Sequence, residues 1–272
     1  MNNTIQLGFS TCPNDTFMFD ALVHGKVDTE GLNFEVTLGD IAELNQLAAT
    51  GSLDMVKVSY NAFSQFQDQY HLLDAGSALG HDCGPLLISK EPISVEEIVA
   101  QNLPVAIPGK NTTANLLLDY FAPNIQNRQE MIFHEIMPAV LEGKAIAGLI
   151  IHENRFTYQD LGLQCIQDLG EYWEQQTGLP IPLGAIVAKH KLGESTLQKL
   201  ERIMRRSVEF AFSQPEASLD FVQCHAQEMN PEVMQAHINL YVNQYSVSLG
   251  TKGRAAVEKL LSLRSASFRS AQ

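Results

Sequence analysis

His152 is the residue in this sequence that most suggests chemistry. It follows a short apolar segment, 148–151, and precedes three polar residues, 153–155. Such an apolar segment is typical of a strand buried on both faces of a parallel sheet. Ligands of open α/β sheets bind outside the carboxyl ends of the strands, where a histidine suits the role of general base. We single out His152 as the candidate catalytic residue, with a purely structural histidine as the alternative.

A second polar segment, 10–15, follows a strand predicted over 5–10 and starts a helix. Pro13 suits the first helical turn, and Asp15 suits the positive end of the helix dipole. The free N–H groups there indicate either an anion site or ordinary capping. Cys12 could be an activated thiolate, but no histidine lies near it in sequence to act as its base.

A third segment, 57–60, ends the buried strand predicted over 53–60. Two interpretations stay open for each of its polar residues. Lys57 pairs with a ligand carboxylate or extends its ammonium group to the surface. Ser59 donates a hydrogen bond to a ligand or caps the helix that follows.

A fourth segment, 108–114, links a strand predicted over 105–107 to a helix that begins at Thr112 and Thr113. Hydroxyl and backbone N–H groups at such a helix start form a seat for a carboxylate. The glycine and lysine spacing of a P-loop is missing. An N-cap with nothing bound is the alternative interpretation.

Composition limits the scaffold that carries these segments. The chain has 272 residues, 45% hydrophobic and 18% charged, which is enough for two cores in a soluble globular protein. Its 18 basic and 31 acidic residues give a net charge of −13, which disfavours nucleic acid and anionic membranes as partners. We expect a small carboxylate ligand held by a local site, and the sequence leaves a homodimer open.

Targeting and metal signals are also missing from the sequence. The N-terminus lacks the basic and apolar regions of a signal peptide, and no apolar run is long enough to span a membrane. The four cysteines match no zinc-site spacing, so we predict no metal site. Reduced thiols in the cytoplasm are the simplest expectation.

The order of elements predicts two α/β lobes, the second inserted in the first. Lobe 1 comprises 1–89 and 188–272, and lobe 2 comprises 90–187, which includes a strand expected over 130–134. The segment 178–184, rich in glycine and proline, reads as a stiff connector. Two chain crossings, near 89–90 and 183–188, would form a hinge beside a central cleft, where small ligands commonly bind.

Taken together, the polar segments and their neighbours resemble one enzyme family across nearly the whole chain. The motifs that match in order and spacing are Gly8–Phe17, Lys57–Tyr60, Ala78–Gly80 with Gly84–Leu86, Pro108–Gly109 with Thr112–Ala114, Gly148–Thr157 and Thr177–Gly184. These residues resemble the 1,4-dihydroxy-6-naphthoate synthases of the futalosine route to menaquinone.

The resemblance implies a two-lobed fold like that of the type II periplasmic binding proteins, used as a carbon–carbon lyase. It implies conversion of cyclic dehypoxanthinylfutalosine to 1,4-dihydroxy-6-naphthoate without metal or redox cofactor. The proton acceptor of the family maps onto His152. Its substrate-binding segments map onto Lys57, Val58 and Ser59 and onto Thr112, Thr113 and Ala114. A non-catalytic anion-binding protein and the chorismate dehydratase of the same pathway are the alternatives.

Overall fold

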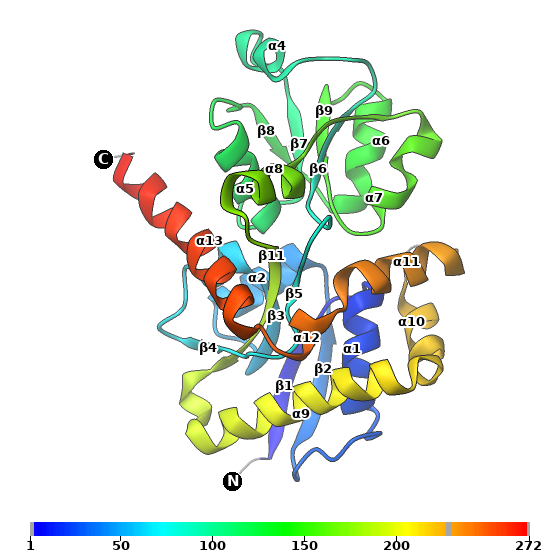
Figure 1. Ribbon diagram of the computed structural model, residues 1–272, viewed down its shortest axis with the longest axis vertical. Helices are drawn as coiled ribbons and strands as arrows, with labels where there is room; N and C mark the ends of the chain where they lie inside the picture. The colour runs from blue at the N-terminus through cyan, green and yellow to red at the C-terminus, as the bar shows by residue number, and fades with distance from the viewer. Residues whose placement is uncertain (1–2, 227–229, 271–272) are drawn as a thin grey trace.

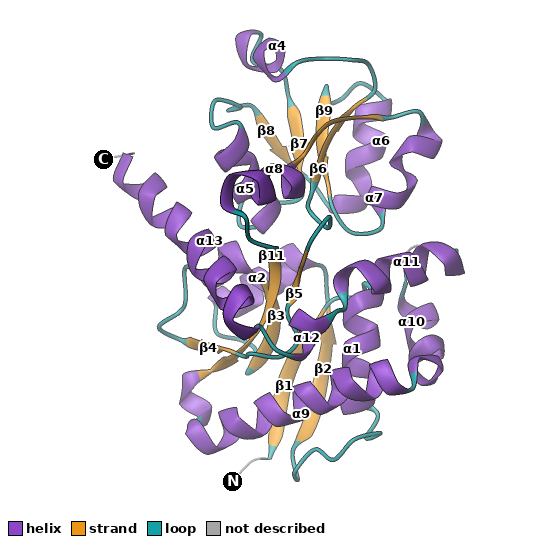
Figure 2. Cartoon of the chain, in the orientation of Figure 1, coloured by secondary structure: helices purple, strands orange, loops and turns teal. Residues whose placement is uncertain are grey.

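Two mixed sheets, each flanked by helices, form the two halves of the molecule, drawn one above the other in Figures 1 and 2. The computed structural model describes residues 3–226 and 230–270. This arrangement confirms the predicted α/β class with two sheets.

The lower sheet carries the first polar segments. Its strand order is β2-β1-β3-β11-β4, with β5 also paired to β11. Strands β1, β2 and β3 are parallel, whereas β11 runs antiparallel to all of its neighbours. The strands span Thr4–Phe9 (β1), Asn33–Leu38 (β2), Met55–Ser59 (β3), Tyr70–Leu72 (β4), Ala78–Gly80 (β5) and Ile181–Lys189 (β11).

Helices from both ends of the chain cover the lower sheet. The long helix α9 crosses α1, and α10 and α11 lie beside α1 (Figure 1). The stacked rings of Phe9 and Phe19, 4.4 Å between centroids, join sheet and helix in this core. The helices span Pro13–Val23 (α1), Ile41–Ala49 (α2), Tyr60–Phe63 (α3), Glu194–Ser213 (α9), Leu219–His225 (α10), Pro231–Tyr241 (α11), Gln244–Val247 (α12) and Gly250–Ser270 (α13).

The upper sheet has the strand order β10-β6-β9-β7-β8. Strand β9 is central and buried along its length, as expected for the strand that precedes His152. The strands span Leu86–Ser89 (β6), Val105–Ile107 (β7), Arg128–Glu130 (β8), Ala147–Ile150 (β9) and Gln164–Asp168 (β10). The helices span Val95–Ala100 (α4), Thr113–Phe121 (α5), Ile136–Leu141 (α6), Asn154–Thr157 (α7) and Leu169–Thr177 (α8).

The chain passes between the two sheets at two connections, one between β5 and β6 and one between α8 and β11. Because β6 already belongs to the upper sheet and β11 begins at Ile181, we propose that the lobe borders fall at these connections. The segment predicted as a stiff connector, 178–184, is instead partly strand: β11 includes Pro182. That proline lacks an N–H donor and sits at a register shift in the β11–β5 pairing, where a ladder bond can be missing.

The prediction of a strand over 130–134 is also wrong. Strand β8 ends at Glu130, and Phe133–Glu135 forms a 3₁₀ turn. The cause is the edge position of β8, which pairs only along the three residues of β7. Beyond that pairing the side chain of Phe133 is buried, whereas the side chain of Ile132 is 46% exposed. The two neighbouring apolar residues therefore do not both pack into the core.

Candidate active site

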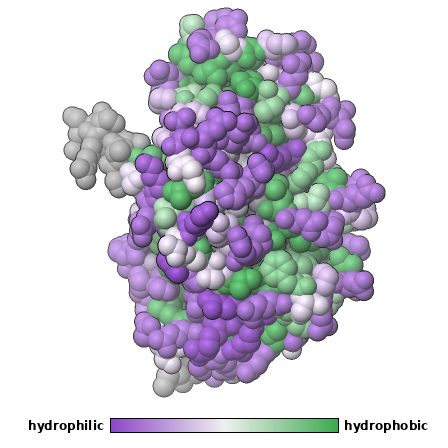
Figure 3. Space-filling view, viewed as in Figure 1, coloured by the Kyte–Doolittle hydropathy of each residue, from purple (hydrophilic) through white to green (hydrophobic). Residues whose placement is uncertain are grey.

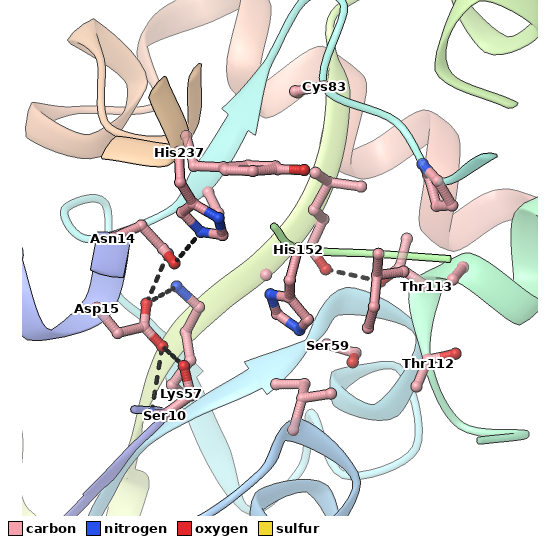
Figure 4. Close-up of a pocket in the computed structure, with 18 residues that line it drawn as sticks. Ser10, Asn14, Asp15, Lys57, Ser59, Cys83, Thr112, Thr113, His152 and His237 are labelled. Atoms are coloured by element: carbon pink, nitrogen blue, oxygen red, sulfur yellow. Dashed lines mark hydrogen bonds and ion pairs between the residues drawn. The ribbon is translucent and has the colours of Figure 1, made fainter. Parts of the chain in front are cut away.

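A cavity opens where the carboxyl ends of β1, β3 and β9 and the start of α5 meet (Figure 4). Its empty volume is about 640 Å³, a figure that includes open solvent. It brings together His152 and five of the six predicted substrate-binding residues: Lys57, Ser59, Thr112, Thr113 and Ala114. Val58 is the exception, since its side chain is fully buried in the apolar core.

His152 follows β9 by two residues and adopts a left-handed backbone conformation, with φ of 58°. Non-glycine residues rarely occupy this region, and such strain, of order 1–3 kcal/mol, is concentrated at functional sites. His152 lies in the sharp turn between β9 and α7, and this turn directs its imidazole into the cavity (Figure 4). The ring packs on Phe133, with centroids 4.9 Å apart.

The environment of His152 suits a neutral base. Burial lowers the pKa of His152 to about 4; the charge of Asp15 opposes this shift and that of Lys57 adds to it. The ring is therefore neutral at physiological pH. Its Nδ1 lies 3.3 Å from Cys12 Sγ. When Nδ1–H donates to that sulfur, Nε2 keeps the lone pair that a base requires.

The contact with Cys12 joins residues that are 140 positions apart in sequence. Burial, followed by the negative charge of Glu153, raises the pKa of the Cys12 thiol well above its usual value. The protonated thiol is a poor nucleophile. Cys12 therefore contacts the candidate base as a neutral thiol in the structure.

A buried ion pair lies at the floor of the cavity. Lys57 Nζ on β3 donates to Asp15 Oδ1 on α1 over 2.7 Å, and both side chains are at most 5% exposed. Asp15 also accepts hydrogen bonds from Asn14 Nδ2 at 2.9 Å and from the Ser10 hydroxyl at 2.7 Å. Lys57 thus neither extends to the surface nor waits unpaired for a ligand.

His237, on α11, extends this network and was missed by the sequence prediction. Its Nε2 lies 2.9 Å from Asn14 Oδ1, and its side chain is fully buried. Because Asn14 Nδ2 donates to the Asp15 carboxylate, Asn14 Oδ1 must accept a hydrogen bond from His237 Nε2–H. Burial holds the pKa of His237 well below its usual range, and the proximity of the titratable His152 ring and the positive charge of Lys57 lower it further. Its position on the buried face of α11, beside Met234 and Ile238, resembles ordinary core packing, so sequence offered no signal.

Hydroxyl and amide groups line the side of the cavity opposite Asp15. The Ser59 hydroxyl accepts from Asn45 Nδ2 at 3.1 Å, so its own proton can be donated to a ligand. Thr112 caps α5 through Asn115 N, and Thr113 donates to Leu183 O. The backbone N–H groups of the first turn of α5 remain directed along the helix axis, where an anion is favoured.

Other candidate residues lie elsewhere. The Arg155 guanidinium pairs with Asp168 at 2.5 Å and donates to Gly84 O. Through Gly84 it contacts the connection between β5 and β6. His81 pairs with Glu174 outside the cavity. His134 is exposed, and it does not line this cavity either.

The surface is predominantly hydrophilic on the face shown in Figure 3, with hydrophobic residues scattered over it. Within the described residues, no helix combines the length and the apolar character that crossing a membrane would require.

Comparison with known proteins identifies the family of this chain. A family described as "Menaquinone biosynthesis" matches residues 5–266. Two curated relatives are called "1,4-dihydroxy-6-naphtoate synthase". The one from Thermus thermophilus is 45% identical, covering 94% of this chain and 92% of its own. The one from Streptomyces coelicolor is 46% identical, covering 95% and 92%.

Solved structures give the fold. Protein AF1704 from Archaeoglobus fulgidus superposes with a TM-score of 0.91 at 33% identity, covering 97% of this chain and 98% of its own. The periplasmic aliphatic sulphonate binding protein SsuA from Escherichia coli gives 0.66 at 12% identity, covering 97% and 87%. The second likeness shows the fold alone, and it confirms the predicted periplasmic-binding-protein-like architecture. With a match over nearly its whole length and relatives at 45–46% identity, this chain belongs to the menaquinone biosynthesis family.

Proposed function

We propose that this protein is a lyase that converts cyclic dehypoxanthinylfutalosine to 1,4-dihydroxy-6-naphthoate, with His152 as the proton acceptor. The observation that carries the proposal is that His152, whose pKa is lowered by burial, faces a cavity that is also lined by Lys57, Ser59 and Thr112. The names of the two curated relatives support the reaction.

The substrate carries an aromatic carboxylate and a ring derived from a sugar. We place the carboxylate at the first turn of α5, formed by Thr112, Thr113 and Ala114, with the Ser59 hydroxyl as a further donor. Lys57 adds positive potential from its pair with Asp15. Val58 contributes only through its backbone, because its side chain lies in the core.

In this arrangement His152 Nε2 takes a proton from the sugar-derived part. The electron pair left behind drives cleavage of a carbon–carbon bond, the small polyol fragment leaves, and the new ring becomes aromatic. Aromatisation provides much of the driving force, so the protein chiefly positions the substrate and removes the proton. A well-placed base contributes about 10²- to 10⁴-fold to the rate.

The test is turnover of cyclic dehypoxanthinylfutalosine, followed as naphthoate absorbance, by wild type and by His152→Asn. Asparagine tolerates the left-handed backbone of position 152, so this variant removes the base without adding strain. His81→Asn is the matched control, since His81 lies outside the cavity.

We expect His152→Asn to lose about 10²- to 10⁴-fold in kcat while it still binds substrate. Near wild-type turnover in this variant would refute the role of His152. Tight binding of a small anion without turnover in wild type would indicate a binding protein, and turnover of chorismate instead would indicate the dehydratase. We further propose that the enzyme is cytoplasmic and functions with one complete cavity per chain. Light scattering would show whether it forms a homodimer.

A further inference from the structure

A chain of polar contacts leads from the buried Asp15 carboxylate to the candidate base. The Ser10 hydroxyl donates to Asp15 Oδ2 at 2.7 Å (Figure 4), and Cys12 Sγ lies 3.3 Å from His152 Nδ1. Ser10 and Cys12 are joined as well. The Cys12 backbone N–H donates to the Ser10 hydroxyl oxygen at 3.3 Å, and the two side chains also interact. Asp15, Ser10 and Cys12 are at most 6% exposed, so this hydrogen-bond chain lies inside the protein.

Counting protons gives the direction of each bond in the chain. Asp15 is the anionic partner of Lys57, and a carboxylate only accepts hydrogen bonds. The single proton of the Ser10 hydroxyl is used on Asp15, which leaves only lone pairs on Ser10 Oγ. The Cys12 thiol keeps its own proton, because burial raises its pKa well above the usual value. In its contact with Ser10 the thiol must therefore be the donor.

The direction of the Cys12 bond decides the tautomer of His152. With its proton turned toward Ser10, the sulfur offers only lone pairs to His152 Nδ1. A neutral imidazole has one ring proton, and the hydrogen bond that one nitrogen makes sets which nitrogen holds that proton. The proton of His152 therefore lies on Nδ1, and Nε2 keeps its lone pair. A free histidine ring in water favours the opposite tautomer, so a base that uses Nε2 needs this selection.

The chain also places a negative charge behind the base. After burial, the charge of Asp15 has the largest influence on the pKa of His152, and it favours the protonated ring. Lys57 opposes this effect. The imidazolium that forms when Nε2 takes a proton would thus face sulfur lone pairs at Nδ1, with a carboxylate beyond them.

We propose that Ser10 and Cys12 are positioning residues that select the tautomer of His152 with a free lone pair on Nε2, and that Asp15 anchors them. Cys12 acts through His152 Nδ1, and Ser10 acts through Cys12. When Nε2 takes a proton, the bond from Nδ1–H to sulfur stays, and no proton moves along the chain. The effect on the rate rests on the proposed function, whereas the tautomer does not.

The experiment is ¹⁵N NMR of the protein labelled in its histidine rings. Long-range ¹H–¹⁵N correlations show which ring nitrogen holds the proton, and His152→Asn identifies the signals of His152. Wild type at neutral pH is expected to hold the proton on Nδ1. Cys12→Ser should keep this tautomer, because a serine hydroxyl can also accept from Nδ1–H while it donates to Ser10. Cys12→Ala should shift the ring toward the tautomer with the proton on Nε2.

A matched control and the kinetics separate this role from simple packing. Cys83→Ala should leave the ring proton of His152 in place, because Cys83 is another buried thiol and lies apart from His152 (Figure 4). In Cys12→Ala we expect kcat to fall roughly 2- to 10-fold, the fold-change that one hydrogen bond corresponds to. KM should change little, and Cys12→Ser should recover most of kcat. Loss of packing alone would lower stability without moving the ring proton.

A ring proton on Nε2 in wild type, or an unchanged tautomer in Cys12→Ala, would overturn the proposal. Should Cys12→Ala fail to fold, Ser10→Ala tests the same chain. Without Ser10 Oγ the thiol is free to donate to Nδ1, so the ring proton should move to Nε2, and an unmoved proton would refute the chain.

Turnover is interpreted separately from the tautomer. A wild-type kcat in Cys12→Ala, with the ring proton moved, would overturn the link between tautomer and rate. If wild type shows no turnover at all, the proposed function fails, while the position of the ring proton still tests the hydrogen-bond chain.

Discussion

The pair formed by Asp15 and Lys57 gives a quantitative test of how the cavity floor is built. Asp15→Asn keeps the shape of the side chain and removes its charge. The Lys57 ammonium, 2.7 Å away and 5% exposed, would then be a buried charge without an anionic partner. Removing one member of a buried pair costs about 3–5 kcal/mol. With roughly 2–4 °C per kcal/mol for a protein of this size class, Tm should fall by about 6–20 °C.

Lys57→Met is expected to cost less, because the carboxylate of Asp15 keeps its hydrogen bonds from Ser10 and Asn14. The double variant Asp15→Asn/Lys57→Met should recover most of the stability lost in Asp15→Asn, since neither charge remains. Chemical denaturation and thermal melts of the four proteins complete the cycle.

Two results would refute this reasoning. A loss below about 1 kcal/mol in Asp15→Asn would show that the pair behaves like an exposed one. A double variant less stable than Asp15→Asn would show that the two charges do not compensate each other. The same variants distinguish an effect on stability from an effect on substrate binding. If Lys57 also attracts the substrate carboxylate, the folded double variant will have a raised KM.

Three further predictions follow from the geometry. The kcat/KM of wild type should stay constant from neutral pH to about pH 5 and fall below it, because His152 is neutral above its lowered pKa of about 4; an acidic limb near 6.5 in the pH profile would contradict the buried environment. Gly84→Ala would place a Cβ 2.2 Å from Gly170 N, so we expect a loss of about 1–3 kcal/mol in a denaturation experiment, and Gly253→Ala, whose nearest contact is 3.3 Å, should cost less. Iodoacetamide should modify the exposed Cys165 and Cys224 but not Cys83, because burial raises the pKa of Cys83 to about 12; an adduct on Cys83 in peptide mass spectrometry would refute its burial.

Local pattern predicted well wherever a structural rule acts over a few residues. Ser94 and Glu97 have the three-residue spacing of a capping box, and the structure forms that box at the start of α4. The buried strand before His152 and the helix start at Thr113 also lie where the apolar run and the capping residues indicated. In an α/β sheet the carboxyl ends of parallel strands face one crevice, so knowing these strands already placed Lys57, Ser59 and Thr112 near His152.

The failures have a common cause in contacts that local pattern does not encode. Residues 130–134 have strand-like composition, but an edge strand extends only as far as its partner β7. The proline-containing segment 178–184 reads as a connector, yet a register shift accommodates Pro182 within β11.

By itself the sequence determined the fold class, the strand that delivers His152 and the polar turns that face it, because each follows from hydrophobic period and capping within about ten residues. Only the tertiary structure decided what surrounds that histidine. It pairs Lys57 with Asp15, places His237 against Asn14 and sets Cys12 beside His152. These contacts join residues 42, 223 and 140 positions apart. They depend on how the two sheets and α11 pack together, and no local period or spacing encodes that packing.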